Sequence, residues 1–399
     1  MLRWKRLSSS LASQVLQSPL KPVHVDNKGK LVEFAGWELP VQYDGAGVMT
    51  ESLHTRSKVS IFDVSHMQQL KLHGPKSSRV AFLEKVTVSS VGNLKPDQGQ
   101  YTLFTNPEGG IIDDAVVANR EEYNHIVCNA ACAAKDIAHL TKQLKGFNHQ
   151  NNEKIEMEVI SDQALIALQG PLAVNILSGL LSEQRDKVSL EKLTFFFSTE
   201  MTIAGIGCTV SRSGYTGEDG FEISIPIPSS VDLVQELLQN PDCKLAGLGA
   251  RDALRLEAGL CLYGHDLDDS ISPVDAGLSW TIGKRRKKEG GFLGADHILG
   301  QLQGSIPVER KRVGLIVDGA PAREGATVVD SSENDIGKIT SGGYSPVLKC
   351  PIAMGYISSQ ADATPDAKVG VQVRGKTYPA RIATMPFVPT HYVKTPKTK

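Results

Sequence analysis

At the centre of the chain stands Thr105-Asn-Pro-Glu-Gly-Gly-Ile-Ile-Asp-Asp-Ala-Val-Val117, a turn-rich segment between two apolar runs. Gly109 and Gly110 can adopt backbone angles that are closed to other residues, so the segment predicts a β-hairpin loop. Two carboxylates, Asp113 and Asp114, enter the strand that follows, and successive strand residues face opposite sides. A buried face would therefore receive one aspartate, which then needs a partner or a function. Alternatively, both aspartates cap the turn or lie at a solvated strand end.

The composition describes an ordinary globular protein. The 399 residues predict two or three domains. Hydrophobic residues make up 41% and charged residues 22%, and the net charge of -1 gives no reason to expect nucleic acid or a membrane as partner. The six cysteines form no CxxC pair and the ten histidines no HExxH motif, which argues against a disulfide scaffold and against a metal site.

The first twenty residues differ from the rest. Met1 to Leu20 contains Arg3, Lys5 and Arg6, five serines and no acidic residue. This composition predicts a mitochondrial transit peptide over residues 1–20, and hence a location in the mitochondrial matrix. A disordered cytosolic tail is the alternative.

The remaining chain divides into two regions with different secondary-structure patterns. Residues 21–304 alternate between strand and helix patterns, which predicts an α+β body. After Gly304 the chain consists of short β runs separated by turn residues, which predicts a small antiparallel barrel or sandwich over residues 305–399. The runs are Val313 to Val317, Ile336 to Thr340, Met354 to Ile357, Val369 to Val373 and Tyr378 to Ile382.

Two polar candidates follow apolar strands. His66, in Asp63-Val-Ser-His-Met67, is an acid–base candidate, although a lone histidine is more often structural. Met67 beside it is a core residue by default. Asn129 follows Ile126-Val-Cys in a strand, and a buried amide must find partners, so it is either a structural bridge or a ligand donor.

Two further candidates lie in glycine-rich surroundings. Glu222 ends Gly214-Tyr-Thr-Gly-Glu-Asp-Gly-Phe-Glu222, a turn and strand without phosphate-loop spacing, and is either solvated or functional. Arg251 opposes the dipole in the first turn of a predicted helix and lies four residues from Arg255. A nearby carboxylate would explain both arginines, although Asp252 already compensates Arg255 in part. The chain has no GxSxG and no GxGxxG opening a βαβ unit, so it gives no sign of a nucleophile, nicotinamide or flavin site.

Six motifs in order carry a family resemblance from about Pro19 to about Tyr392. They resemble the aminomethyltransferase, or T-protein, family of the glycine cleavage system. The motifs are Phe34-Ala-Gly-Trp-Glu-Leu-Pro-Val-Gln-Tyr43, Phe62-Asp-Val-Ser-His-Met67, Gly109-Gly-Ile-Ile-Asp-Asp114, Gly214-Tyr-Thr-Gly-Glu-Asp-Gly220, Ala250-Arg-Asp-Ala-Leu-Arg-Leu-Glu-Ala-Gly-Leu-Cys-Leu-Tyr-Gly264 and Met385-Pro-Phe-Val-Pro-Thr390.

The resemblance implies a reaction and a fold. The one-carbon unit of an aminomethyl group on the lipoyl arm of H-protein passes to tetrahydrofolate, which gives ammonia, methylenetetrahydrofolate and the dihydrolipoyl arm. Tetrahydrofolate is then a co-substrate, and neither metal nor flavin is expected. The implied fold has two interleaved α+β domains within residues 21–304 and a C-terminal β-barrel, arranged around a central folate cavity.

The resemblance also implies roles for residues. Asp114 becomes the catalytic, inward-facing aspartate, and Asp113 a structural partner on the turn side. Glu222 and Arg251 hold the pterin, whose donors and carbonyl they match. The other implied pocket residues are Met67, Tyr101, Val127, Asn129, Tyr215, Trp280 and Tyr392. Arg323 is expected to be structural or to line the entrance.

Related families fit less well. The folate-binding proteins of iron–sulfur assembly carry Lys-Gly-Cys-Tyr-x-Gly-Gln, whereas this chain has the cysteine-free Ser213-Gly-Tyr-Thr-Gly-Glu218. Dimethylglycine and sarcosine dehydrogenases need a flavin domain, for which there is no room before Leu31. The basic run Lys284-Arg-Arg-Lys-Lys288 is either a solvated face or a docking surface for an acidic H-protein.

Overall fold

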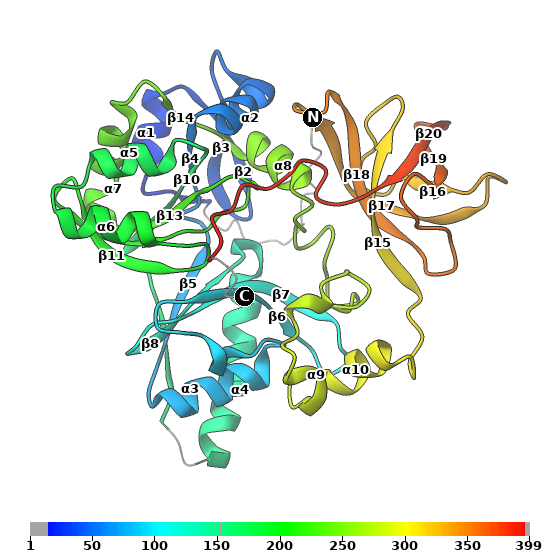
Figure 1. The fold of residues 1–399 in the computed structure, drawn as a ribbon, viewed down its shortest axis with the longest axis horizontal. Helices are drawn as coiled ribbons and strands as arrows, with labels where there is room; N and C mark the ends of the chain where they lie inside the picture. Colours follow the sequence, from blue (N-terminus) through cyan, green and yellow to red (C-terminus); the bar gives the residue numbers. More distant parts are fainter. Residues whose placement is uncertain (1–14, 152–153, 396–399) are drawn as a thin grey trace.

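Three lobes meet at the centre of the molecule (Figure 1). In the computed structural model, which describes residues 15–151 and 154–395, each lobe is built around its own large sheet. Two lobes form the body and the third is a closed barrel at the C-terminal end. The predicted α+β body followed by an antiparallel barrel is therefore confirmed.

The first lobe contains a six-stranded sheet with the order β11-β12-β13-β10-β4-β14. Its helices share an apolar core with one face of this sheet. Phe221, Ile223 and Ile225 are completely buried in that core, as their alternation predicts. The elements are α1 (Lys21–Asp26), β4 (Val59–Asp63), β10 (Gln163–Gln169), α5 (Ala173–Gly179), α6 (Gln184–Lys192), β11 (Ser198–Ile203), β12 (Ile206–Ser211), β13 (Gly220–Pro226), α7 (Ile227–Leu238) and β14 (Cys243–Leu245).

The second lobe contains a five-stranded sheet with the order β6-β7-β8-β5-β9. The chain enters it after β4 and returns to the first lobe at β10, so the two lobes are interleaved. Apolar residues of α3 and α4 form one core with a single face of the sheet. The elements are β5 (Gln68–His73), α3 (Lys76–Val86), η1 (Val91–Asn93), β6 (Gly99–Thr105), β7 (Ile111–Asn119), β8 (Tyr123–Cys128), η2 (Ala130–Cys132), α4 (Ala133–Asn151) and β9 (Glu156–Val159).

Smaller elements connect the lobes. A three-stranded sheet with the order β1-β3-β2 lies beside α2 and α8, and helical segments lead from the body to the barrel. The bounds are β1 (Leu16–Gln17), β2 (Gly29–Phe34), β3 (Trp37–Tyr43), α2 (Gly47–Ser57), α8 (Leu248–Glu257), η3 (Ser279–Thr281), α9 (Arg286–Glu289) and α10 (Ala295–Gln303).

The third lobe is a closed barrel with the order β15-β18-β17-β16-β19-β20. Five of its strands coincide with the predicted β runs. The sixth, β16, has only three residues and is flanked by polar turns, so its pattern is too short to be read from the sequence. The strands are β15 (Arg310–Val317), β16 (Thr327–Val329), β17 (Asp335–Ser345), β18 (Cys350–Ser358), β19 (Lys368–Val373) and β20 (Lys376–Ala383).

The C-terminal tail runs from the barrel back across the body (Figure 1). Backbone bonds fix it at three points: Val388 N donates to Glu257 O (3.0 Å), His391 N to Gly217 O (2.8 Å), and Val393 O accepts from Phe195 N (2.7 Å). The tail thus binds the barrel to the first lobe.

The end of the predicted transit peptide, residues 18–20, packs into the body, whereas Val15 and Leu16 are exposed. Ser18 and Leu20 are buried, and the Ser18 hydroxyl donates to the buried Asp63. A cut after residue 20 would remove these two buried residues from the first lobe, and the boundary at residue 20 stays a prediction. The first fourteen residues of the predicted leader lie outside the described part of the chain.

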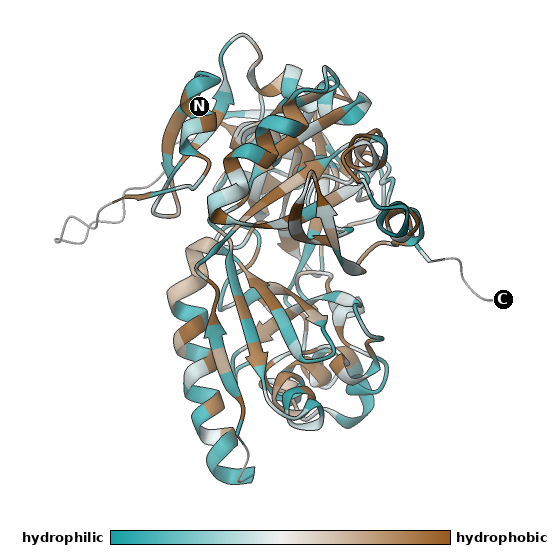
Figure 2. Cartoon of the chain, turned by 90° about the vertical axis from the view of Figure 1, so that its left-hand side faces the viewer, coloured by the Kyte–Doolittle hydropathy of each residue, from teal (hydrophilic) through white to brown (hydrophobic). Residues whose placement is uncertain are grey.

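Hydropathy follows the layers of the fold. Figure 2 shows apolar residues on the strands and on one side of the helices, with hydrophilic residues outside. Within residues 15–151 and 154–395, no helix is both long and apolar enough to cross a membrane.

Candidate active site

The segment from Thr105 to Val117 forms the predicted hairpin between β6 and β7. Asn106 closes its loop, because Asn106 O accepts from Gly109 N (3.0 Å) and Asn106 Oδ1 accepts from Gly110 N (2.8 Å). Gly109 has a φ of +90°, and a Cβ at Gly110 would lie 1.8 Å from the backbone oxygen of Asp269. Both glycines are therefore required, one by its conformation and the other by the close approach of a second segment.

The two aspartates of β7 face opposite sides of the sheet, as expected. Asp113 is 0% exposed and lies on the side covered by α4. Asp114 is only partly buried and shares its face with Val116, which lines the gap between the two body sheets. The interpretation of Asp113 as a turn-side residue is wrong, because β7 is covered on both faces. Asp113 is the one that points into the core, and Asp114 points into the gap.

Asn129 joins the two aspartates. Its backbone N–H donates to Asp113 Oδ2 (3.1 Å), and its Nδ2 donates to Asp113 Oδ1 (2.9 Å) and Asp114 Oδ1 (2.8 Å). The Asn129 Nδ2 group also lies 3.2 Å from the backbone oxygen of Asp114, so its donors are used within the protein. Asn129 is therefore a structural bridge between the two aspartates, and its role as a ligand donor stays a prediction.

Asp114 has an environment suited to proton transfer. Burial and the neighbouring Asp113 raise the pKa of Asp114 to about 7, although hydrogen bonds from Tyr101 and Asn129 oppose the shift. The Tyr101 ring stacks on Trp280, with 5.8 Å between centroids, and Trp280 remains 65% exposed. A carboxyl group of this pKa can both accept and release a proton near neutral pH.

A cavity lies between the two sheets beside Val116, the next residue of β7 on the Asp114 face, although Asp114 itself is not among its lining residues. Its empty space, including the part open to solvent, is about 520 Å³. Two of the predicted pocket residues line it, Val127 on β8 and Glu222 on β13. Ser213 donates to Glu222 Oε2 (2.6 Å) and so fixes the carboxylate on the opposite sheet from Asp114.

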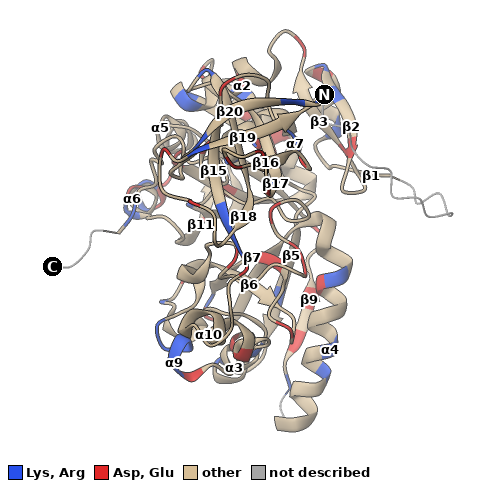
Figure 3. Ribbon diagram, turned by 90° about the vertical axis from the view of Figure 1, so that its right-hand side faces the viewer, with Lys and Arg blue, Asp and Glu red and all other residues tan. Residues whose placement is uncertain are grey.

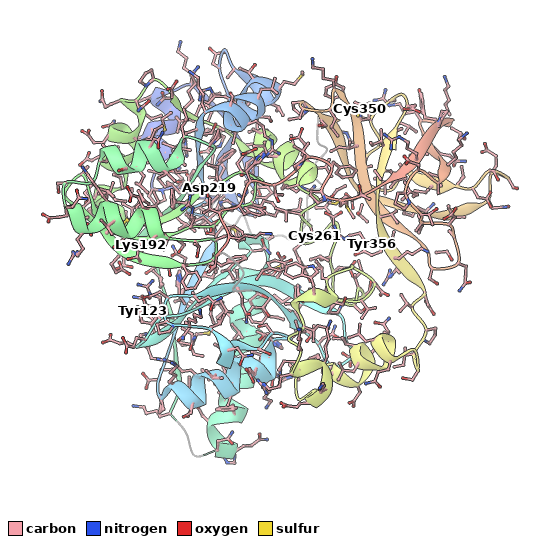
Figure 4. The ribbon with its side chains drawn as sticks, viewed as in Figure 1. Tyr123, Lys192, Asp219, Cys261, Cys350 and Tyr356 are labelled. Atoms are coloured by element: carbon pink, nitrogen blue, oxygen red, sulfur yellow. The ribbon has the colours of Figure 1, made fainter. Side chains whose placement is uncertain are left out.

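Arg251 and Tyr215 form a third part of the site. The Arg251 guanidinium lies 4.7 Å from the centroid of the Tyr215 ring. Burial lowers the pKa of Arg251, whereas the charge of Glu222 and the Tyr215 hydroxyl oppose this shift. Tyr215 donates to the backbone oxygen of Cys261, which lies near the junction of the lobes with Tyr356 of the barrel beside it (Figure 4).

The two helical arginines have different partners. Arg255 is buried, with its Nη1 2.7 Å from Asp266 and its Nη2 2.7 Å from Asp252. The carboxylate expected near Arg251 is Glu222, which acts through its charge. Glu51, which the sequence reading missed, accepts from Gly247 N (2.9 Å) and places a carboxylate at the start of the same helix.

The remaining predicted residues lie at the edges. Met67 packs with Val127 against an apolar cluster between the lobes. Tyr392 stacks on Phe195 with 4.2 Å between centroids, beside the cavity residues Phe196 and Phe197. His66 is buried against Phe34, and burial together with Arg251 lowers its pKa to about 4.

Two basic features have structural partners. Arg323 donates to the backbone oxygen of Gly342 (2.8 Å) within the barrel. In the basic run, Arg285 bonds Glu84 and Glu289 (2.6 Å), and Arg286 is buried against the Glu84 backbone. The run therefore presents chiefly Lys284, Lys287 and Lys288 outward, and Figure 3 shows acidic residues mixed with basic ones around α9.

Family models match most of the chain. The model described as "GCVT N-terminal domain" matches residues 20–286, and "Glycine cleavage T-protein C-terminal barrel domain" matches residues 310–389. The chain belongs to the T-protein family of the glycine cleavage system. It is therefore an aminomethyltransferase, a tetrahydrofolate-dependent transferase.

Individual T-protein relatives agree over nearly the full length. Mitochondrial aminomethyltransferase of Dictyostelium discoideum is 46% identical over 402 residues, which cover 98% of this chain and 96% of that protein. The Homo sapiens enzyme is 45% identical over 386 residues, with 96% and 93% covered. The crystal structure of aminomethyltransferase T from Bartonella henselae aligns with a TM-score of 0.85 and 36% identity, covering 95% of this chain and 100% of that one. The mitochondrial location predicted from the N-terminus is confirmed by the relatives.

Proposed function

We propose that the chain transfers the one-carbon unit of an aminomethyl group on the lipoyl arm of H-protein to tetrahydrofolate. Two carbon–nitrogen bonds form, from folate N5 and N10 to the methylene carbon, while the carbon–sulfur and carbon–amine bonds break. The two protons lost by N5 and N10 go to the departing amine and the departing sulfur. The products are 5,10-methylenetetrahydrofolate, ammonia and dihydrolipoyl H-protein, with no change in the oxidation state of the carbon.

The position of Asp114 carries this proposal. A reaction that removes a proton from folate nitrogen and returns one to a leaving group needs a group whose pKa is near the working pH. Asp114, with a pKa of about 7 and a face turned to the gap, meets that requirement. In its ionised form Asp114 accepts the proton from the folate nitrogen, and in its protonated form it donates a proton to the leaving group. Holding the two substrates close together and in the right orientation provides the remaining rate enhancement.

Two charged groups that interact with each other, Glu222 in the cavity and Arg251 near it, suit a pterin ring. Glu222 offers carboxylate oxygens to the amino and ring N–H donors of a pterin, and Arg251 offers donors to its carbonyl. Tyr215 lies against Arg251 and presents a flat face for stacking. Val127, Met67 and Tyr101 supply apolar contact, and Trp280 lies at the exposed side, where the lipoyl arm would enter.

Product analysis tests this function. Wild-type protein is mixed with aminomethyl-loaded H-protein and tetrahydrofolate, and the methylenetetrahydrofolate and free lipoyl thiols are measured together. The proposal predicts one methylenetetrahydrofolate for each dihydrolipoyl arm. Formation of thiols without the folate product would contradict it.

A further inference from the structure

A second buried carboxyl group lies behind Asp113. Asp136, in the first turn of α4, is 0% exposed, and its side chain faces that of Asp113. Among the described residues, no N–H or O–H donor reaches either oxygen of Asp136. Two carboxylates in contact repel each other, and a hydrogen bond between them requires that one of them carries a proton.

The surroundings show which carboxyl group holds that proton. Asp113 receives the two Asn129 donors and the Cys132 thiol, so the charged form of Asp113 is solvated by the protein. Asp136 has no comparable donors. Lys135, the adjacent cation, extends instead to Tyr263 (2.6 Å) and Asp269 (3.4 Å). The proton therefore belongs on Asp136, which donates it to Asp113.

The pair is connected to the reacting face of β7. Asp113 holds the Asn129 amide at 2.9 Å, and the same Nδ2 contacts Asp114 Oδ1 at 2.8 Å. Any change in the charge or position of Asp113 is thus transmitted to Asp114 through one amide. Asp136 is fully buried, so its contact with the reacting face runs through this chain, and the charge of Asp114 also acts on it directly.

We propose that Asp136 is a positioning residue for the transferase reaction, because the proton that it shares with Asp113 holds Asp113 in place. The Asp113–Asp136 pair then carries a single negative charge beside Asp114. This inference rests on the proposed role of Asp114. The Asp136–Asp113–Asn129 relay fixes both the orientation of the Asn129 amide and the field that Asp114 experiences.

The titration of the cluster agrees with the geometry. Burial and the Asp113 carboxylate raise the pKa of Asp136 far above the ordinary range of a carboxyl group, while Lys135 opposes this. Burial likewise raises the pKa of the nearby thiols of Cys128 and Cys132, which therefore remain neutral donors. The remaining neighbours with titratable groups, Tyr101 and Tyr263, have raised pKa values as well. Asp136 is thus protonated when Asp114 ionises.

Two substitutions separate this role from a merely structural one. Asp136→Asn keeps a donor to Asp113, so kcat should stay within about threefold of wild type, whereas Asp136→Leu should lower kcat at least about tenfold with little change in the KM for folate. In Asp136→Leu the Asp113 carboxylate loses the proton donor that Asp136 provides, so the pKa of Asp113 rises and its negative charge beside Asp114 is reduced. The acid limb of the kcat profile should then move to lower pH.

A matched control accounts for lost stability. Asp186 is also a buried aspartate in the first turn of a helix, α6, and accepts from Thr202 N (3.0 Å), but it lies in the first core. Asp186→Leu should destabilise the protein and leave kcat per folded molecule unchanged. The proposal would be overturned if Asp136→Leu kept wild-type turnover and an unshifted acid limb. It would also be overturned if Asp136→Asn lost as much kcat as Asp136→Leu.

Infrared spectroscopy tests the shared proton independently of catalysis. At a pH one to two units above the pKa of about 7 for Asp114, that carboxyl group is ionised. The spectrum of wild type minus that of Asp136→Asn should then contain the carbonyl band of a protonated carboxylic acid. If the band is absent, the relay is wrong. If the band is present but tetrahydrofolate does not stimulate ammonia release, the proposed function fails and the shared proton stands.

Discussion

Adjacent residues of one strand have opposite environments in this protein. The pleat of β7 directs Asp113 toward α4 and Asp114 toward the gap between the body sheets. The sequence predicts that division, but it cannot show which face is covered by a helix and which by a second lobe. The partly exposed residue has the position suited to chemistry, and the fully buried residue supports it.

The first prediction concerns Asp114 itself. Asp114→Asn removes the group that exchanges the proton but keeps its size and its contact with Asn129. Folate affinity should remain within about tenfold while turnover falls at least about a hundredfold, the usual scale for a lost general base. Titration of folate and single-turnover kinetics measure the two effects. A larger loss of turnover in folded Asp113→Asn would contradict the assignment.

The second prediction is the pH dependence of turnover. Burial raises the pKa of Asp114 to about 7, and in the proposed reaction the ionised form accepts the folate proton. Turnover should therefore rise with pH and reach half its maximum near that value. In Asp114→Asn this acid limb should be absent. A wild-type rate that falls as the pH increases through this region would show that the protonated form is the active one.

At the scale of elements, the hairpin between β6 and β7 positions both aspartates. A Cβ at residue 110 would lie 1.8 Å from the Asp269 backbone, which cannot move without the segment that carries it. Gly110→Ala should lower the free energy of unfolding by about 1–3 kcal/mol, as overpacking does, and should also lower turnover. Denaturant titration measures the change.

Gly146→Ala is the matched control for this substitution. Gly146 lies in α4 with an ordinary helical conformation, and nothing lies within 4 Å of the Cβ position. The same chemical change should raise stability there by about 0.5–1 kcal/mol, because alanine favours a helix over glycine. If Gly110→Ala is no more destabilising than Gly146→Ala, the hairpin is not constrained by the Asp269 segment.

Elements with a clear period could be predicted from the sequence, whereas contacts between distant elements could not. Phe221, Ile223 and Ile225 alternate, and β13 follows that alternation. The stacking of Tyr101 on Trp280 joins segments that the sequence separates widely. Asp136 does not stand out in the sequence, because an acidic residue in the first turn of a helix is the ordinary pattern for the helix dipole. Its burial depends on Asp113, which only the fold brings near.

At the scale of the molecule, a buried polar contact joins the body and the barrel. Arg255 of α8 bonds Asp266 (2.7 Å) and also Ser341 of the barrel (2.9 Å). Arg255→Met should cost about 3–5 kcal/mol, because Asp266 is left buried without its cation. Arg381→Gln, which breaks an exposed pair with Asp366, should cost at most about 1 kcal/mol. Thermal unfolding measures both losses of stability, and equal losses in Arg255→Met and Arg381→Gln would contradict this distinction.

The lysines in α9 and just before it provide a test of H-protein docking. Replacement of Lys284, Lys287 and Lys288 by glutamine should raise the KM for H-protein at low salt, because surface charges mainly affect association. The same replacement of Lys142, Lys145 and Lys154, on and after α4, is the matched control. An unchanged KM at low salt would remove this docking surface.

The central claim is that tetrahydrofolate accepts the one-carbon unit at the gap that Asp114 faces. Its most direct test is the rate of ammonia release from aminomethyl-loaded H-protein with and without tetrahydrofolate. Folate should strongly stimulate ammonia release by the wild type, and this stimulation should be lost in Asp114→Asn. Equal rates with and without folate in the wild type would contradict it.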